Sequence, residues 1–265
     1  MSYRRRLWRA IDRQKSGYRR AMRPVFKRAF DKQIQPFLNE IMDFTDITHI
    51  EAPIKLDPEP MQAAYKRLYM TAALDFAMQD RDRAKSDSGL YILKSEDEII
   101  ADMIMLAIND YMATEIGLTI EAIGDTSILK IQRILEKLVP EIIDSGIGGG
   151  AAQTALRDQI KSAWHRDRYF RTERIVRTEV NRASNWGSLK GVQSTGAPHY
   201  KLWLAAFTAT SRPEHGDAEG QRVDIDEDFD VMGESLQYPG DPAGSAANTI
   251  NCLCSMTYET KELTE

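Results

Sequence analysis

"AAQTALRDQIKSAWHRDRYFRTERIVRTEVNRASNWGSLKGVQST", residues 151–195, is the stretch that decides the fold. It contains no proline, and opposite charges recur three or four positions apart, as in Glu173–Arg177 and Glu179–Arg182. Such spacings place the paired side chains on one face of a helix. The stretch therefore predicts a helix of 45 residues, which would extend about 67 Å at roughly 1.5 Å per residue.

The segment before this helix, "SGIGGG" (145–150), holds four glycines in six residues. Glycine tolerates backbone angles that other residues avoid, so we interpret the segment as a hinge. Around it the sequence predicts a mainly α N-terminal part with a long helix, followed by a small α+β C-terminal module. The expected divisions are a basic amphipathic helical arm (1–56), a helical domain (57–144), the glycine hinge (145–150), the long helix (151–196) and the C-terminal module (197–265).

Residues 1–44 carry apolar side chains at spacings of three, four or seven, which is the period of an amphipathic helix. Pro24 is expected to kink or split this helix. Further helices are expected from 57 to about 81, from 95 to about 117, where Gly117 would end the segment, and over 126–143. The expected apolar stripe of the arm consists of Leu7, Ile11, Tyr18, Met22, Phe26, Phe30, Ile34, Phe37 and Ile41.

The same arm is strongly basic. Residues 1–30 contain eleven Lys or Arg and one acid, Asp12, although the whole chain of 265 residues has a net charge of −5. This asymmetry indicates an acidic partner, either a protein surface or DNA phosphates, while a solvated helix face is the simpler alternative. The candidate partner-binding residues are Arg4, Arg5, Arg6, Arg9, Arg19 and Arg20.

Composition and motifs exclude several classes. The longest apolar stretch, 99–108, is too short to span a bilayer and contains Asp102, so we expect no membrane partner. No apolar region follows the basic N-terminus, and only two cysteines occur, which favours assembly in a reducing cytoplasm. The chain has no phosphate-binding glycine loop, no nucleophile elbow and no His-Glu-x-x-His motif. We therefore expect no cofactor and no enzymatic activity.

The two cysteines, Cys252 and Cys254, stand one residue apart in "NTINCLCSMTYET" (248–260), which alternates enough to predict a last strand. On a strand both would share a face. They could bind Zn²⁺ together with His215 and an acid such as Asp217 or Asp241, but Cys-x-Cys alone is a weak zinc signal. Redox chemistry is a third interpretation. We expect packing in the core and no stoichiometric metal.

Residues 177–196, "RTEVNRASNWGSLKGVQSTG", resemble the helix signature of phage minor head proteins typified by the Mu F protein. That pattern is an Arg-Thr-Glu triplet followed by an Arg, an Asn and a small residue. Downstream, the family usually has a Trp strand, an Arg-rich turn, a His followed by a Gly, a Pro-x-Asp-Pro-like loop and a terminal Asn-Cys-x-Cys. The chain has them in this order, over about 125–258. The matching positions are Arg177, Thr178, Glu179, Arg182, Asn185, Gly187, Trp203, His215, Gly220, Asn251, Cys252 and Cys254.

The resemblance implies a structural protein of a tailed phage or prophage, located inside the virion head near the portal. Its partners would be the portal protein, the interior of the capsid or scaffold, and viral DNA, with a role in head morphogenesis and in packaging or ejection of DNA. The chain departs from the family pattern at "AAFTATSR" (205–212), at "SAANTI" (245–250) and at Leu253, where the family has polar residues. The alternative is an enzymatic or toxin-like effector, ADP-ribosyltransferase-like or nuclease, carried by the C-terminal module.

Overall fold

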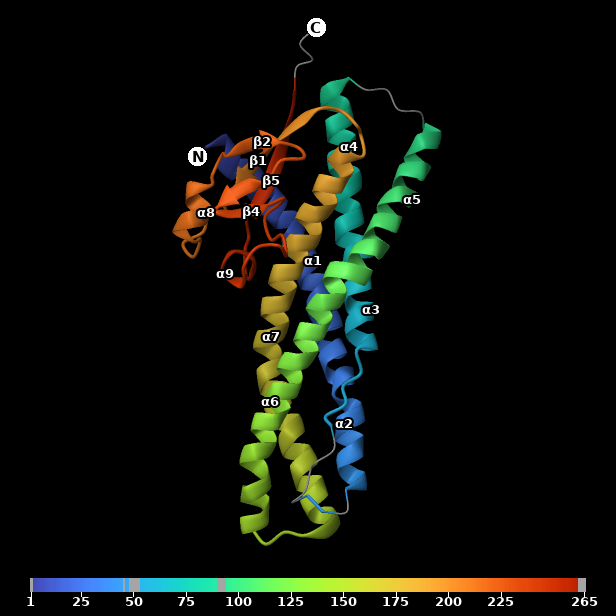
Figure 1. The fold of residues 1–265 in the computed structure, drawn as a ribbon, viewed down its shortest axis with the longest axis vertical. Coiled ribbons are helices and arrows are strands. Elements are labelled where there is room, and N and C mark those ends of the chain that lie inside the picture. The colour runs from blue at the N-terminus through green and yellow to red at the C-terminus, as the bar shows by residue number, and fades with distance from the viewer. Residues whose placement is uncertain (1, 45, 48–52, 90–93, 262–265) are drawn as a thin grey trace. The chain divides into compact units, whose positions relative to one another are not determined.

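The structure is a computed structural model that describes residues 2–44, 46–47, 53–89 and 94–261. It is mainly helical, with a small module of short antiparallel strands near the C-terminus, as the sequence predicts (Figure 1). The helices are α1 (Tyr3–Gln33), α2 (Gln35–Glu40), α3 (Glu59–Leu68), α4 (Leu74–Ser88), α5 (Lys94–Tyr111), α6 (Gly117–Asp144), α7 (Gly149–Gln193), α8 (Pro213–Asp217) and α9 (Ala246–Thr249), with a 3₁₀ turn at Ile41–Asp43.

Two π-helical turns each join two α-helices into one continuous helical stretch. Tyr69–Ala73 links α3 to α4, and Met112–Ile116 links α5 to α6. The expected end near Gly117 is therefore wrong, because the helical backbone continues through this glycine into α6. Helix α4 is capped at its C-terminus by Gly89, whose φ of +67° is the left-handed conformation that suits glycine after a helix. Within the described residues, no helix is long and apolar enough to cross a membrane.

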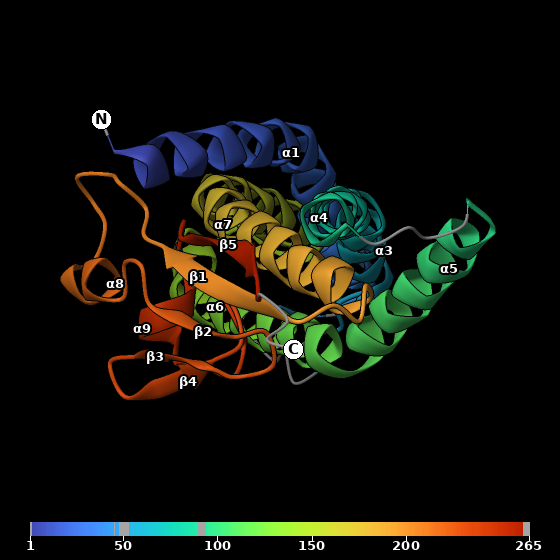
Figure 2. The same ribbon diagram turned by 90° about the horizontal axis from the view of Figure 1, so that it is seen from above.

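The strands form two small antiparallel sheets. The first has the order β2-β1-β5 and consists of β2 (Arg222–Asp224), β1 (His199–Leu204) and β5 (Ser255–Thr260). In its register, Trp203 lies opposite Met256. The second is a hairpin of β3 (Phe229–Val231) and β4 (Glu234–Leu236). The first sheet lies beside the C-terminal part of α7, where the hydroxyls of Ser188 and Tyr258 are 2.9 Å apart (Figure 2).

The described chain divides into two compact units that are not consecutive in sequence. Unit 1 comprises residues 1–22, 66–112 and 174–265, and unit 2 comprises residues 23–65 and 113–173. The expected division into consecutive segments is corrected, since α1 and α7 each contribute one part to each unit. A long amphipathic helix can supply two cores along its length, and hydrophobic periodicity does not indicate where one core ends.

The glycine segment 145–150 is not a boundary between units. It connects α6 and the start of α7, and both of these belong to unit 2. Gly146 and Gly149 have φ values of +72° and +56°, a conformation that L side chains rarely adopt. The glycines therefore form the turn between two helices of one unit, and the expectation of a hinge between two halves is corrected.

The core of unit 2 is aromatic. Phe30 and Trp164 meet edge to face with ring centroids 6.1 Å apart, and the Trp164 indole donates a hydrogen bond to the Phe30 carbonyl. The guanidinium of Arg171 lies 4.6 Å from the centre of the Phe30 ring. Phe26 packs against Tyr65 at 5.1 Å. These contacts join α1, α3 and α7, and they involve Phe26 and Phe30 of the predicted stripe, which are both fully buried.

In unit 1 the buried face of α1 differs from the predicted stripe. Trp8, Lys15 and Met22 are buried there, while Leu7, Ile11 and Tyr18 are only half-buried. The helix also continues through Pro24 instead of being split. Met22 belongs to the predicted stripe, whereas Trp8 and Lys15 do not, and hydrophobicity alone does not identify a lysine as a core residue.

Two glycines let α7 approach the helix that contains α4. A Cβ at Gly187 would overlap the backbone carbonyl of Ala73, and a Cβ at Gly191 would overlap that of Ala77. Both pairs lie in unit 1. Close approach of two backbones requires residues without side chains at the contact. Gly187 therefore has a packing role.

We expect Gly187→Ala and Gly191→Ala each to lower the free energy of unfolding by about 3 kcal/mol, because the backbones must separate. Gly17→Ala is the matched control. Gly17 lies within α1, and no atom lies within 4 Å of the position that an added methyl group would take, so alanine should raise stability by about 1 kcal/mol. Urea unfolding followed by circular dichroism measures all three. Equal stability of Gly187→Ala and the wild type would contradict the close contact.

Candidate functional site

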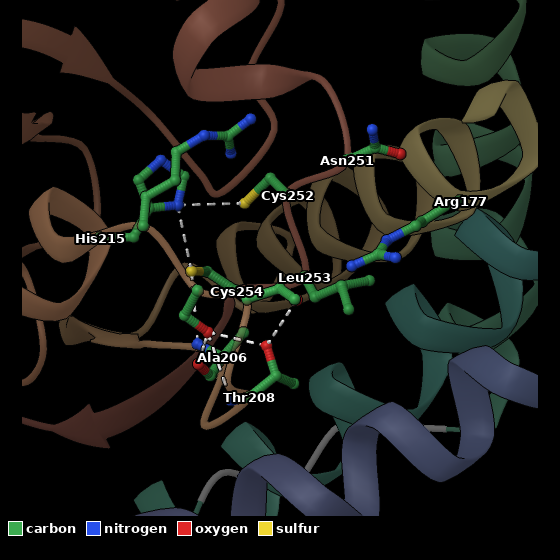
Figure 3. A pocket seen from close by; sticks show the side chains of 11 residues that line it. Arg177, Ala206, Thr208, His215, Asn251, Cys252, Leu253 and Cys254 are labelled. Atoms are coloured by element: carbon green, nitrogen blue, oxygen red, sulfur yellow. Dashed lines mark hydrogen bonds between the residues drawn. The ribbon is translucent and has the colours of Figure 1, made fainter.

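A small pocket in unit 1 brings together several of the predicted site residues. Its wall is formed by the loop after β1, by α8, by the loop before β5 and by Arg177 of α7 (Figure 3). The pocket offers about 20 Å³ to solvent. Its lining residues are Arg177, Ala206, Thr208, Thr210, Ser211, Arg212, His215, Asn251, Cys252, Leu253 and Cys254.

His215, Cys252 and Cys254 form one buried cluster in this wall. The His215 Nδ1 atom is 3.6 Å from the Cys252 sulfur and 3.4 Å from the Cys254 sulfur. All three residues are at most 2% exposed. The two cysteines precede β5 instead of lying in it, which corrects the expected strand, but both sulfurs still face the same edge of the imidazole (Figure 3). Both cysteines are free thiols.

The orientation of His215 is fixed from its other side. The Asn248 side-chain amide donates to the Val231 carbonyl, which turns the Asn248 oxygen toward His215 Nε2 at 3.3 Å. Nε2 must then carry the hydrogen and donate a hydrogen bond to Asn248, because a carbonyl oxygen can only accept one. The neutral ring therefore presents the Nδ1 lone pair to the two sulfurs. The Trp203 ring packs edge to face against the His215 ring, with ring centroids 5.9 Å apart.

The thiols share charge with the imidazole. A hydrogen bond from Cys254 and the neighbouring His215 hold the pKa of Cys252 well below its usual range despite burial, and the same hydrogen bond with burial raises the pKa of Cys254. Burial lowers the pKa of His215, but the hydrogen bond and charge of Cys252 outweigh it and bring the net pKa above the ordinary value.

The predicted motif residues of α7 hold the downstream loops in place. The Thr178 hydroxyl accepts a hydrogen bond from the backbone of Asn251, and Asn185 donates to the carbonyls of Pro239 and Cys254. Arg182 donates to the Gly240 carbonyl at 3.0 Å. All of these α7 side chains are buried. They therefore anchor the two loops that follow β4 and precede β5.

Two other motif positions have local structural roles. Glu179 is buried and forms an ion pair with Arg182, in which Oε1 and Nη1 are 3.0 Å apart. Burial raises the pKa of Glu179, while the charge of Arg182 opposes this shift. Gly220 has a φ of +77° and lies under the guanidinium of Arg4, so a side chain would be strained and crowded there. Arg177 is different, because it is half-buried in the pocket wall and its Nε has no hydrogen-bond partner among the described residues.

Lys15 is a buried residue that sequence reasoning missed. Its ammonium donates three hydrogen bonds of 2.8 Å, to the Asn181 and Asn185 side-chain oxygens and to the Ser255 hydroxyl. Burial lowers the pKa of Lys15 to about 7, and the charges of nearby groups change it less. Nothing in the sequence distinguishes Lys15 from the ten other cations of residues 1–30. The polar pair at Asn181 and Asn185, one helical turn apart, is the signal that could have indicated a buried partner.

The six predicted partner-binding residues all lie on α1. Arg4 lies 3.9 Å from Glu219, and Arg19 binds Asp12 at 2.7 Å. Arg4, Arg5, Arg6, Arg9 and Arg20 are exposed. The apolar side of the arm is not a free surface, because Trp8 is buried and donates from its indole to the Leu253 carbonyl at 2.9 Å. The exposed side of the arm is therefore cationic.

The comparisons with known proteins give one partial match. No family model and no solved structure matches the chain. A curated relative, the NAD(+)–arginine ADP-ribosyltransferase EFV of Enterococcus faecalis, is 33% identical over 90 residues, which is 33% of this chain and 18% of that protein. The chain thus matches less than a fifth of the relative's length.

This match corrects one expectation from the sequence. We expected no enzymatic activity, and the relative that shares a third of the chain is named as an enzyme. The expectation relied on missing catalytic motifs, and a motif search does not detect chemistry arranged in an unfamiliar order.

We predict that Lys15 gives the protein a distinctive pH dependence. The pKa of Lys15 is about 7 in the folded protein and near 10.5 when unfolded, so the unfolded state binds more protons between these values. Stability from this group should therefore rise with pH, by roughly 2 kcal/mol from pH 7 to pH 9. Lys15→Met should lose this rise.

The measurement is urea unfolding at pH 7 and pH 9. Lys27→Met serves as the control, since Lys27 is an exposed lysine of the same helix. An equal rise in Lys15→Met and the wild type would show that Lys15 does not titrate in this window.

Proposed function

We propose that the protein is a minor head protein of a tailed phage or prophage, which acts in procapsid assembly at the portal. It would be assembled in the host cytoplasm and reside inside the virion head. Its partners would be the portal protein, the capsid or scaffold interior and viral DNA, and it would assist in packaging or ejection of the DNA.

One observation supports this proposal above the others. The motif residues that resemble the head protein family are scattered from 177 to 254, yet in space they contact one another. Thr178, Arg182 and Asn185 hydrogen-bond to the loops at 239–240 and 251–254, and Cys252 and Cys254 lie against His215. An order of residues that arose by coincidence would not be expected to converge on one folded module.

The exposed face of α1 is the surface we assign to an anionic partner. Arg5, Arg9 and Arg20 are exposed and lie at spacings of four and eleven, which places them on one side of a helix. Arg13 is also exposed and falls on the same side. Because the opposite side of α1 is buried in unit 1, binding would rest on charge and would weaken with salt.

We expect the triple variant Arg5→Gln, Arg9→Gln and Arg20→Gln to lose capture of the portal protein from the same genome. The matched control removes three exposed cations elsewhere, Arg133→Gln, Lys137→Gln and Lys161→Gln, and should retain capture. Pull-downs over a salt series measure both. If the contact is to DNA, the slope of log affinity against log salt should fall by about 0.9 for each lost phosphate contact. Equal capture of portal and of DNA by both variants would exclude α1 as the docking surface.

A second candidate function is ADP-ribosyl transfer, favoured by the similarity to the Enterococcus enzyme. The full chain, incubated with labelled NAD, should then transfer label to a poly-arginine acceptor and not to poly-lysine. Heat-denatured protein is the blank. Label on poly-arginine no higher than the blank would remove this candidate and leave the head proposal untouched.

A further inference from the structure

We propose that His215, Cys252 and Cys254 bind a zinc ion, with the fourth coordination position open to the pocket. The three ligand atoms lie within 4.8 Å of one another, and all three residues are buried. The inference goes beyond the proposed function and does not depend on it.

The spacing of the ligand atoms fits a tetrahedral ion. With Zn–S near 2.3 Å and Zn–N near 2.05 Å, a tetrahedral angle separates sulfur and nitrogen by about 3.6 Å. The distances from His215 Nδ1 to the two sulfurs are 3.6 and 3.4 Å. The cluster is therefore shaped for an ion that all three groups can reach.

The groups around the ligands are those that a metal site needs. The Asn248 oxygen accepts a hydrogen bond from His215 Nε2–H and so leaves Nδ1 as a lone-pair donor, which is the usual way a ligating histidine is held. The backbone amide of Ala206 donates to the Cys254 sulfur at 3.4 Å, a contact that stabilises negative charge on that sulfur. Two of the three ligands thus already have an outer partner.

Charge favours a divalent cation. Two buried thiolates side by side repel each other, whereas two thiolates and one neutral imidazole around Zn²⁺ sum to zero charge. Thiolate and imidazole ligands together select zinc or another soft ion over magnesium and calcium, which take oxygen.

The fourth position is left to solvent. Neither of the two acids that the sequence suggested as a ligand occupies the fourth position. Asp217 is exposed, and the Asp241 oxygens accept hydrogen bonds from the backbone of Gln237 and Ala243. The three ligands instead line the pocket, whose 20 Å³ suffices for one water molecule. Three protein ligands with one open position is the arrangement of zinc sites that bind water or a small ligand, in contrast to closed structural sites.

The experiment is metal analysis of the full chain purified without chelator, followed by titration of the metal-free protein with Co²⁺. We expect about one zinc per chain, and a thiolate-to-cobalt charge-transfer band that saturates at about one equivalent. Cys252→Ser and His215→Ala should lower zinc content at least tenfold. Thr210→Ala is the matched control, because Thr210 lines the same pocket, is exposed and offers no thiolate or imidazole.

A rescue variant separates ligation from packing. His215→Cys should restore zinc binding that His215→Ala loses, since a thiolate can replace an imidazole as a ligand but differs from it in shape. Wild-type protein with less than about a tenth of a zinc per chain and no cobalt band would overturn the proposal. A Cys252–Cys254 disulfide in freshly purified protein, detected by mass, would overturn it as well.

Discussion

The ammonium of Lys15 is the constraint around which unit 1 is organised. A buried cation is costly unless each of its donors is satisfied, and Lys15 finds three acceptors, two from α7 and one from β5. Removal of any one element would leave a charge in the core without its partner. If the lysine loses its proton, it can still donate twice and accept from the Ser255 hydroxyl, so the network serves both protonation states. Lys15 thus ties together three segments that lie far apart in the sequence.

The residues that carry the family resemblance are explained largely by architecture. Asn185 both receives Lys15 and holds the carbonyls of Pro239 and Cys254, so a single amide joins α1, α7 and two loops. Gly187 permits the close approach of α7 to Ala73. The remaining residues differ, because His215, Cys252, Cys254 and Arg177 line one pocket. The motif thus combines positions that hold the module together with positions that line its pocket, and their contacts distinguish the two.

The mainly helical fold class and the long helix were predictable from the sequence, because α7 combines an unbroken helical period with the absence of proline. The sequence predicted the identity of the cluster residues from their order, but no local pattern reports that His215 lies 3.4 Å from a sulfur 39 positions away. The predictions of a glycine hinge and of a separate basic arm were wrong for a common reason. Glycines at 145–150 and an apolar stripe describe local preference, while the partner that covers a face is a tertiary fact. Lys15 could not be identified, since burial of one cation among eleven depends on acceptors that begin 166 residues later.

The outer and inner faces of α1 differ in what they contact. The outer face carries Arg5, Arg9 and Arg20 toward solvent. On the inner face, Trp8 holds the carbonyl of Leu253, the residue between the two cysteines, and Lys15 holds Ser255, the residue after Cys254. Helix α1 therefore holds the segment 252–255 at two points, one on each side of Cys254. The N-terminal helix and the cysteine segment are thus packed together within unit 1, although they lie at opposite ends of the sequence.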